Sequence, residues 1–290
     1  MKEQKTHDKT AKASHGKLDA RPGLYRKPSA HPTIIYLCWI LTSILSGAFE
    51  GTDLFRTIAG EVDGIFPPVM NSPASLPDHP IWLTLGRGQP LGQPWAAYSS
   101  ISVGGQLKTW RAATGIWSSG DKLYRETSLT TALAKQIPHY LRVGFSLAYH
   151  KVTIDRFDPI KGVLLMGAAL SAPLSEDMEA AVWYGGQVMG RKQAYESLSR
   201  QLFQLAVTSR IGDHYTWALA VEKTPGYALR QVMEVSFITW RELTLQLGYR
   251  TEPGIPYGSA HVPIGRLLLS VRLNYHPIFG PSTAFGVAFK

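Results

Sequence analysis

Serine and histidine are the residue types in this sequence that could support nucleophilic catalysis, because a histidine can accept the proton of a neighbouring serine hydroxyl. Ser146 and His150 lie on one face of an alternating run, and the other candidate histidines are His214, His261 and His276. All four histidines are expected at strand ends or in loops, and no serine stands in a Gly-Xaa-Ser-Xaa-Gly elbow. The sequence therefore predicts that the protein is not an enzyme.

Metal and cofactor chemistry has no supporting pattern either. Cys38 is the only cysteine, which excludes a Cys-Xaa-Xaa-Cys metal site and a disulfide framework. No His, Asp or Glu cluster has metal-ligand spacing. Residues 86–89 (GRGQ) lack the third glycine and the strand–helix context of a dinucleotide loop, so we expect a turn there. We expect neither a metal nor a cofactor.

A further set of charged and amide residues alternates with apolar residues along the chain. If the apolar residues face lipid, this polar set lines an enclosed lumen, because a charge on the lipid face costs about 2–4 kcal/mol at mid-membrane. Two interpretations remain open, a wall that contacts a plug or a solute path and an ion-pair network that fills a closed lumen. The candidate lumen-lining residues are Arg142, Glu222, Glu234, Gln246, Arg250, Arg272 and Asn274.

Strands must position these residues, because the dominant hydrophobic period after about residue 80 is two, as in 141–149 and 267–275. Exported barrels have an even number of strands, so thirteen weak matches indicate 12 or 14. Prolines are expected between strands, where a missing backbone N–H costs no ladder bond; they are Pro159, Pro173, Pro253, Pro256 and Pro281. The predicted strands are 81–87, 95–104, 106–117, 123–135, 139–153, 162–171, 178–188, 200–210, 214–223, 228–239, 241–250, 265–275 and 283–289.

Three features favour an antiparallel transmembrane β-barrel over a soluble β-sandwich. The polar face is rich in small residues, whereas the apolar face ends in aromatic residues, which are typical of lipid–water girdles. The strands are longer than those of most soluble sheets. Phe285, Val287 and Phe289 share one face at the C-terminus, as in the strand that the barrel assembly machinery recognises, although Lys290 follows. A periplasmic β-sandwich binding protein is the alternative.

The N-terminal region has the pattern of an export signal. An apolar run of about a dozen residues, 34–45, follows a basic stretch, and Ser46, Gly47 and Ala48 supply the small residues that precede cleavage. We expect residues 1–48 to be an extended basic region plus signal peptide, cut after Ala48, unless translation starts downstream of Met1. An uncleaved anchor or a buried helix is the alternative. Residues 1–33 carry +5 of the net +9, so nucleic-acid binding is not expected.

Four short segments resemble FadL-like and PorV/PorQ-like outer-membrane proteins. They are residues 71–76 (NSPASL), 123–129 (LYRETSL), 247–253 (LGYRTEP) and 273–283 (LNYHPIFGPST). The first resembles an Asn-Pro-Ala-Xaa-Leu signature with Ser72 inserted. The resemblance implies a barrel of about 14 strands over residues 81–290, with residues 49–80 partly inside it as a hatch. Asn71, Pro73 and Ala74 of this hatch motif would shape a constriction or anchor the plug.

The family resemblance also implies a function and partners. The chain is short for a fatty-acid channel, which favours the PorV/PorQ-like branch, an accessory in protein secretion or surface assembly with secretion-system partners. The alternative is a FadL-like passive channel for small hydrophobic solutes, and a purely structural barrel is a third possibility. A side opening at a strand kink, with an apolar pocket behind residues 65–80, would favour the channel. Outer-membrane lipid and the barrel assembly machinery are expected partners in the bacterial outer membrane.

Overall fold

The computed structural model describes residues 65–137, 141–155, 160–189, 201–225, 228–239 and 242–290. The predicted signal peptide, its cleavage site after Ala48, and residues 49–64 of the predicted hatch lie outside these described residues. No helix of the described part is long and apolar enough to cross a membrane.

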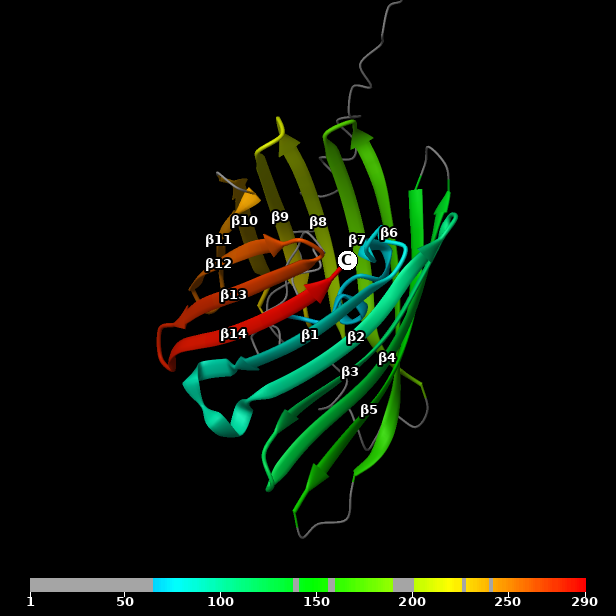
Figure 1. The fold of residues 1–290 in the computed structure, drawn as a ribbon. Helices are drawn as coiled ribbons and strands as arrows, with labels where there is room; N and C mark the ends of the chain where they lie inside the picture. Colours follow the sequence, from blue (N-terminus) through cyan, green and yellow to red (C-terminus); the bar gives the residue numbers. More distant parts are fainter. Residues whose placement is uncertain (1–64, 138–140, 156–159, 190–200, 226–227, 240–241) are drawn as a thin grey trace, which may run out of the picture.

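Fourteen antiparallel strands close into a single barrel, in which each strand pairs with its neighbour in sequence and β1 pairs with β14 (Figure 1). The prediction of an all-β barrel with an even strand number is confirmed, and a two-sheet sandwich is excluded because the sheet closes on itself. The strands are β1 (Trp82–Gln89), β2 (Tyr98–Leu107), β3 (Trp110–Gly120), β4 (Tyr124–Ile137), β5 (Leu141–Ile154), β6 (Ile160–Ser175), β7 (Met178–Met189), β8 (Leu202–Ile211), β9 (Tyr215–Lys223), β10 (Arg230–Ile238), β11 (Thr244–Arg250), β12 (Ile255–Ile264), β13 (Leu267–His276) and β14 (Gly280–Phe289).

Strand β12 was missed by the sequence analysis. The first three positions of its outward face are Pro256, Gly258 and Ala260, and large apolar residues follow only at Val262 and Ile264, so the alternation that marks the other strands is weak. The expectation that prolines lie between strands is wrong for Pro173, Pro256 and Pro281, each of which lies near the end of a strand. A proline is tolerated at strand ends and bulges, and the β6–β7 register shifts just after Pro173. Residues 86–89 continue β1 and form no turn.

Most outward-facing side chains are apolar and exposed, while inward-facing ones are small, polar or, at a few positions such as Trp82 and Tyr257, aromatic. Phe145 is 61% exposed, Leu247 60% and Phe285 61%, as expected for residues that face lipid. Aromatic residues lie toward the ends of this outer face, among them Tyr215, Tyr249 and Tyr275. The orientation inferred from the alternating pattern is therefore confirmed.

Inside the barrel, large aromatic rings lie across glycines of the neighbouring strand. Trp82 on β1 pairs with Gly104 on β2, and Tyr257 on β12 pairs with Gly248 on β11. A Cβ added to Gly104 would lie 2.4 Å from the Trp82 ring, and one added to Gly248 would lie 2.1 Å from the Tyr257 ring. Because no side chain fits there, glycine is required at both positions if the rings are to lie flat along the wall.

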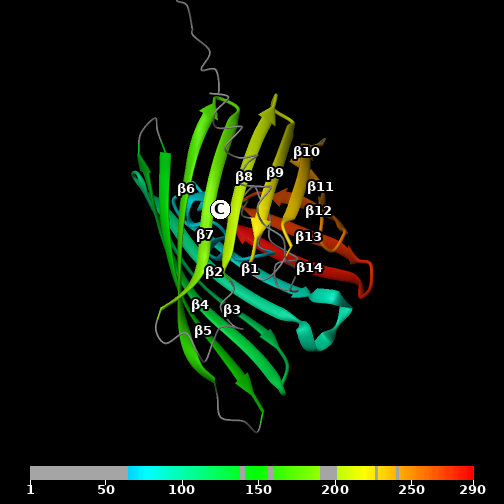
Figure 2. The same ribbon diagram turned by 180° about the vertical axis from the view of Figure 1, so that it is seen from behind.

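Residues 65–80, named here the inner segment, lie inside the barrel in both views (Figures 1 and 2). Two 3-10 helices form part of it, η2 (Pro68–Met70) and η3 (Pro73–Ser75), and they contact β3, β4, β5 and β6. Ile65 and Val69 are 0% exposed, and Leu76 is 1% exposed. The inner segment therefore contributes the apolar core of a lumen that is otherwise largely polar.

The two ends of the barrel differ in the length of their connections. Two-residue turns join β2 to β3, β6 to β7 and β12 to β13, whereas residues 90–97 join β1 to β2 at the other end. Both β1 and β14 have their terminal ends, Trp82 and Phe289, at the end with short turns. Bacterial barrels have short periplasmic turns and longer extracellular loops, so the short-turn end is the periplasmic one.

Candidate functional site: the barrel lumen

The predicted lumen-lining residues all lie on inward faces of strands. Arg142, on β5, is half-buried. The other six are at most 3% exposed and come from β9, β10, β11 and β13; they are Glu222, Glu234, Gln246, Arg250, Arg272 and Asn274. One side of the lumen, the β8–β13 wall, therefore holds most of the buried charge.

A first polar group of this wall lies toward the extracellular end and centres on Glu222. The Arg230 Nε donates to Glu222 Oε2 at 2.6 Å, and a second Arg230 nitrogen forms an ion pair with the same oxygen. Gln204 Nε2 donates to Glu222 Oε1 at 2.9 Å. Sequence reasoning missed Gln204 and Arg230, although Gln204 alternates with Phe203 and Leu205 in the same way as the predicted lumen residues. Both carboxylate oxygens are thus satisfied by neighbouring strands.

A second group forms around Tyr257, which lies on the strand that the sequence analysis missed. The Tyr257 hydroxyl donates to Glu234 Oε1 at 2.6 Å, and Arg272 Nη2 lies 3.9 Å from the same oxygen. The Arg272 guanidinium also stacks over the Tyr257 ring at 4.2 Å, a distance suited to a cation–π contact. Three strands, β10, β12 and β13, are therefore joined through one aromatic ring and its charged neighbours.

His261 is buried within β12, so its predicted place in a loop or at a strand end is wrong. Its Nδ1 lies 2.9 Å from Ser270 Oγ and its Nε2 lies 3.1 Å from Ser259 Oγ. Ser259 donates to Gln246 Oε1 at 2.8 Å, so it accepts from His261 and is not deprotonated by it. The row of Ser270, His261, Ser259 and Gln246 therefore joins three strands by hydrogen bonds.

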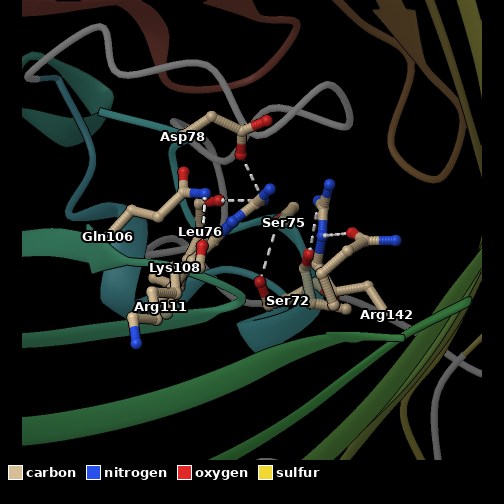
Figure 3. A network of polar contacts seen from close by, with 10 residues as sticks. Ser72, Ser75, Leu76, Asp78, Gln106, Lys108, Arg111 and Arg142 are labelled. Carbon is tan, nitrogen blue, oxygen red and sulfur yellow. Dashed lines mark hydrogen bonds and ion pairs between the residues drawn. The ribbon is translucent and has the colours of Figure 1, made fainter. Parts of the chain in front are cut away.

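The opposite wall binds the inner segment through two arginines (Figure 3). Arg111, on β3, donates from Nη1 to the Leu76 carbonyl at 2.9 Å and forms an ion pair with Asp78. Arg142, on β5, donates from Nη1 to the Ala74 carbonyl at 2.8 Å, and its Nε donates to Gln136 Oε1 at 3.0 Å. Arg111 was missed, although it alternates with Trp110 and Ala112. These contacts attach the segment to strands far from it in sequence.

The hatch-motif residues Asn71, Pro73 and Ala74 are buried inside the barrel. A Cβ added to Gly144 would lie 2.6 Å from the Ala74 nitrogen, so η3 rests directly on the backbone of β5. Tyr98, on β2, also donates its hydroxyl to the Ile65 carbonyl at 2.7 Å. Whether the motif shapes a constriction or only anchors the segment stays a prediction.

Strand pairing is irregular in the β6–β7 pair beside the part of the wall that η3 contacts. The register shift between Met166 and Gly167 leaves Gly186 of β7 as an extra residue at φ 85°. Inside this stretch, side chains from the segment and the wall form an apolar cluster. We name it the η3 cluster; its buried members are Ala74, Ala169, Trp183 and Leu202.

Two remaining predictions concern metals and the C-terminus. No three His, Cys, Asp or Glu side chains in the described ranges converge in a way that could hold a metal ion. The outward face of β14, the strand that pairs with β1 to close the barrel, carries Phe285, Val287 and Phe289. Recognition of this face by the assembly machinery stays a prediction.

A closed barrel with an apolar outer face and a polar, partly filled lumen defines the class: the protein is a bacterial outer-membrane β-barrel. No family model and no curated protein sequence matches the chain. The Ralstonia pickettii toluene transporter TbuX has the same fold at 10% sequence identity, covering 83% of this chain and 97% of the transporter with a TM-score of 0.59.

Two further solved structures share the fold. The CymD monoaromatic hydrocarbon channel is 9% identical, covering 76% of this chain and 90% of its own, with a TM-score of 0.54. The Acinetobacter baumannii outer-membrane protein Omp33 is 10% identical, covering 73% of this chain and 98% of its own, with a TM-score of 0.50. These comparisons show the fold of outer-membrane barrels; they do not show membership of the PorV/PorQ branch.

Proposed function

We propose that the protein is a passive outer-membrane channel for small hydrophobic solutes, the FadL-like alternative of the sequence analysis, rather than a secretion accessory. The observation that carries this proposal is the η3 cluster, which lies against the irregularly paired wall of β6 and β7. An apolar solute gains about 25 cal/mol for each Å² of apolar surface that it buries. The η3 cluster is therefore one of the apolar places inside the barrel at which such a solute is stabilised.

The irregular pairing supplies a route between this cluster and the lipid. A bulge leaves its extra residue outside the ladder and bends the strand, and here the extra residue is Gly186. On the outer side of the same stretch, Met166 is 40% exposed and Tyr184 is 39% exposed. A hydrophobic solute thus crosses from Trp183 on the inside to an apolar outer face without entering water.

The solved structures with the same fold support this class of solute over protein partners. One of them is described as a toluene transporter and another as a monoaromatic hydrocarbon channel. The secretion reading has no comparable support from the described residues. Small aromatic hydrocarbons are therefore the solutes to test first.

The test is uptake of radiolabelled toluene by cells that export the full chain, compared with cells that carry an empty vector. Deletion of Gly186 removes the extra residue, restores regular β6–β7 pairing, and is expected to reduce the initial uptake rate toward the empty-vector rate. The matched control, Gly186→Asn, keeps the extra residue with a side chain that tolerates positive φ and should retain uptake. Heat-shifted gel mobility of each variant verifies the folded barrel. A folded wild-type barrel with empty-vector uptake would overturn the proposal.

A further inference from the structure

The inner segment satisfies only part of its own backbone by internal hydrogen bonds, because its sequence is rich in proline. A proline has no N–H to donate, and a short 3-10 helix leaves most of its carbonyls without partners. The carbonyls of Ala74 and Leu76 are instead bound by arginine side chains of the wall. Five of the sixteen residues of the segment are prolines, namely Pro67, Pro68, Pro73, Pro77 and Pro80.

We infer that Arg111 and Arg142 form a clasp that holds the inner segment in the lumen, and that release of this clasp opens the barrel to water and ions. This clasp concerns how the lumen is closed, so it holds whether or not the transported solute is hydrophobic. Its acceptors are main-chain carbonyls two positions apart, bound from two different strands. The hydrogen bonds of both arginines must break before this part of the segment can leave the wall.

Arg111 binds the inner segment at two points. Its guanidinium is buried, with a side chain 6% exposed, and it contacts the Leu76 carbonyl and the Asp78 carboxylate together. Asp78 is 64% exposed, so this half of the clasp has one face toward solvent. The carboxylate comes from the inner segment itself, and neutralising it weakens the grip without changing the wall.

Arg142 contributes the second half of the clasp without help from an acidic side chain. Within the described part of the chain, its guanidinium contacts are Gln136 Oε1 and the Ala74 carbonyl. Gln136, on the neighbouring strand β4, thus orients the arginine toward η3. A full positive charge is used to bind an uncharged carbonyl, which indicates that holding the segment is the task of this side chain.

The clasp lies at the periplasmic end of the barrel, close to the point where the inner segment joins β1. Arg111 and Arg142 are each the second residue of a strand that starts at the periplasmic end. The segment continues from Leu76 through Pro77 and Pro80 into β1, so the clasp holds it close to the point where it joins the wall, while Tyr98 holds its other end through the Ile65 carbonyl. In the clasped state Ala74 is 0% exposed.

The experiment compares ion conductance of the purified full chain in planar lipid bilayers containing KCl. The double variant Arg111→Gln/Arg142→Gln is expected to raise the mean conductance per barrel about tenfold or more, because loss of one charge-assisted hydrogen bond shifts an equilibrium by about that factor. Asp78→Asn should give a smaller increase. Arg125→Gln changes an exposed arginine at the opposite end of β4 and should leave conductance unchanged.

A second readout follows the segment itself. Cys38 is the only cysteine of the chain, so Ala74→Cys in a Cys38→Ser background gives a single reporter thiol. A membrane-impermeant maleimide should leave this thiol largely unlabelled in the otherwise wild-type barrel and label it rapidly in the double variant. Heat-shifted gel mobility verifies folding, and Asp78→Asn with Arg142→Lys replaces the double variant if the latter fails to fold. Unchanged labelling overturns the clasp, and increased labelling without increased conductance overturns its role in closing the barrel.

Discussion

The inward-facing arginines of the two lumen walls have different partners. On the β8–β13 wall, Arg230 binds Glu222 and Arg272 lies near Glu234, so each arginine ties one wall strand to another. On the β3–β5 wall, Arg111 and Arg142 bind carbonyls of the inner segment. The first set supports the barrel, whereas the second positions what the barrel contains. An inward-facing arginine of an alternating strand can therefore join two wall strands or bind the inner segment, depending on the acceptor that lies opposite it.

This difference predicts opposite consequences for stability and for closure. Removing a carboxylate from the β8–β13 wall leaves a buried cation without its counter-charge, which is costly. Removing a clasp residue breaks a contact between the wall and the inner segment and leaves the pairing between the wall strands unchanged. The first change should unfold the barrel more easily, and the second should open it.

The largest effect is expected for Glu222→Ala. Glu222 is 2% exposed and neutralises Arg230, so its loss should lower the free energy of unfolding by about 3–5 kcal/mol. Urea titration of the barrel in lipid vesicles, followed by tryptophan fluorescence, measures the change. Glu176→Ala in the exposed β6–β7 turn is the control and should be neutral. A loss below about 1 kcal/mol, the range of exposed ion pairs, would show that Arg230 is solvated and would break the comparison between the two walls.

Gly248→Ala probes the packing of the same wall. The new methyl group would meet the Tyr257 ring, and overpacking of this kind should lower the free energy of unfolding by about 1–3 kcal/mol. The matched control is Gly258→Ala on the adjacent strand, where the nearest side-chain atom would lie at an ordinary 3.4 Å. Equal urea midpoints for the two variants would mean that the Tyr257 ring is free to move away from Gly248.

Asp78→Asn tests the β3–β5 wall, because Asp78 pairs with Arg111 of β3. Asp78 is largely exposed, so its ion pair with Arg111 should contribute only about 0–1 kcal/mol to the free energy of unfolding. The same urea titration should therefore barely distinguish this variant from the wild type, although its conductance increases. A stability loss as large as that of Glu222→Ala would place Arg111 among the residues that support the barrel.

The smallest effect is expected at Asp121, in the turn between β3 and β4. Its carboxylate accepts hydrogen bonds from the Tyr124 and Leu123 N–H groups, at 3.0 and 2.8 Å, and these bonds lower the pKa of Asp121. The lowered pKa means that this stabilisation is complete above the unfolded pKa of about 3.9 and is lost as pH falls through the folded value. The protection of the Tyr124 amide, measured as its exchange rate relative to that of an unfolded peptide at the same pH, should therefore fall only below about pH 4. Protection that is already lost at pH 6 would contradict this assignment.

Period-two alternation predicted which face of most strands points inward, and hence that residues such as Glu222 and Arg272 are buried. It failed at β12, where proline, glycine and alanine occupy the first three outward positions. It also could not distinguish Arg142 from Arg250, because alternation specifies a face and contains no information about which distant backbone carbonyl lies opposite. The contacts of Ala74 and Leu76 depend on how an irregular, proline-rich segment folds inside the barrel, which no local periodicity records.

The connection between the inner segment and β1 has a consequence for biogenesis. The segment leads directly into Trp82, and β1 forms the closing seam with β14, the last strand of the chain. If the seam closed first, residues 65–76 would have to enter a lumen already bordered by packed aromatic rings. The order of assembly is therefore constrained. The inner segment must fold against the wall strands while the sheet is still open, and β14 then pairs with β1 around a lumen that is already occupied.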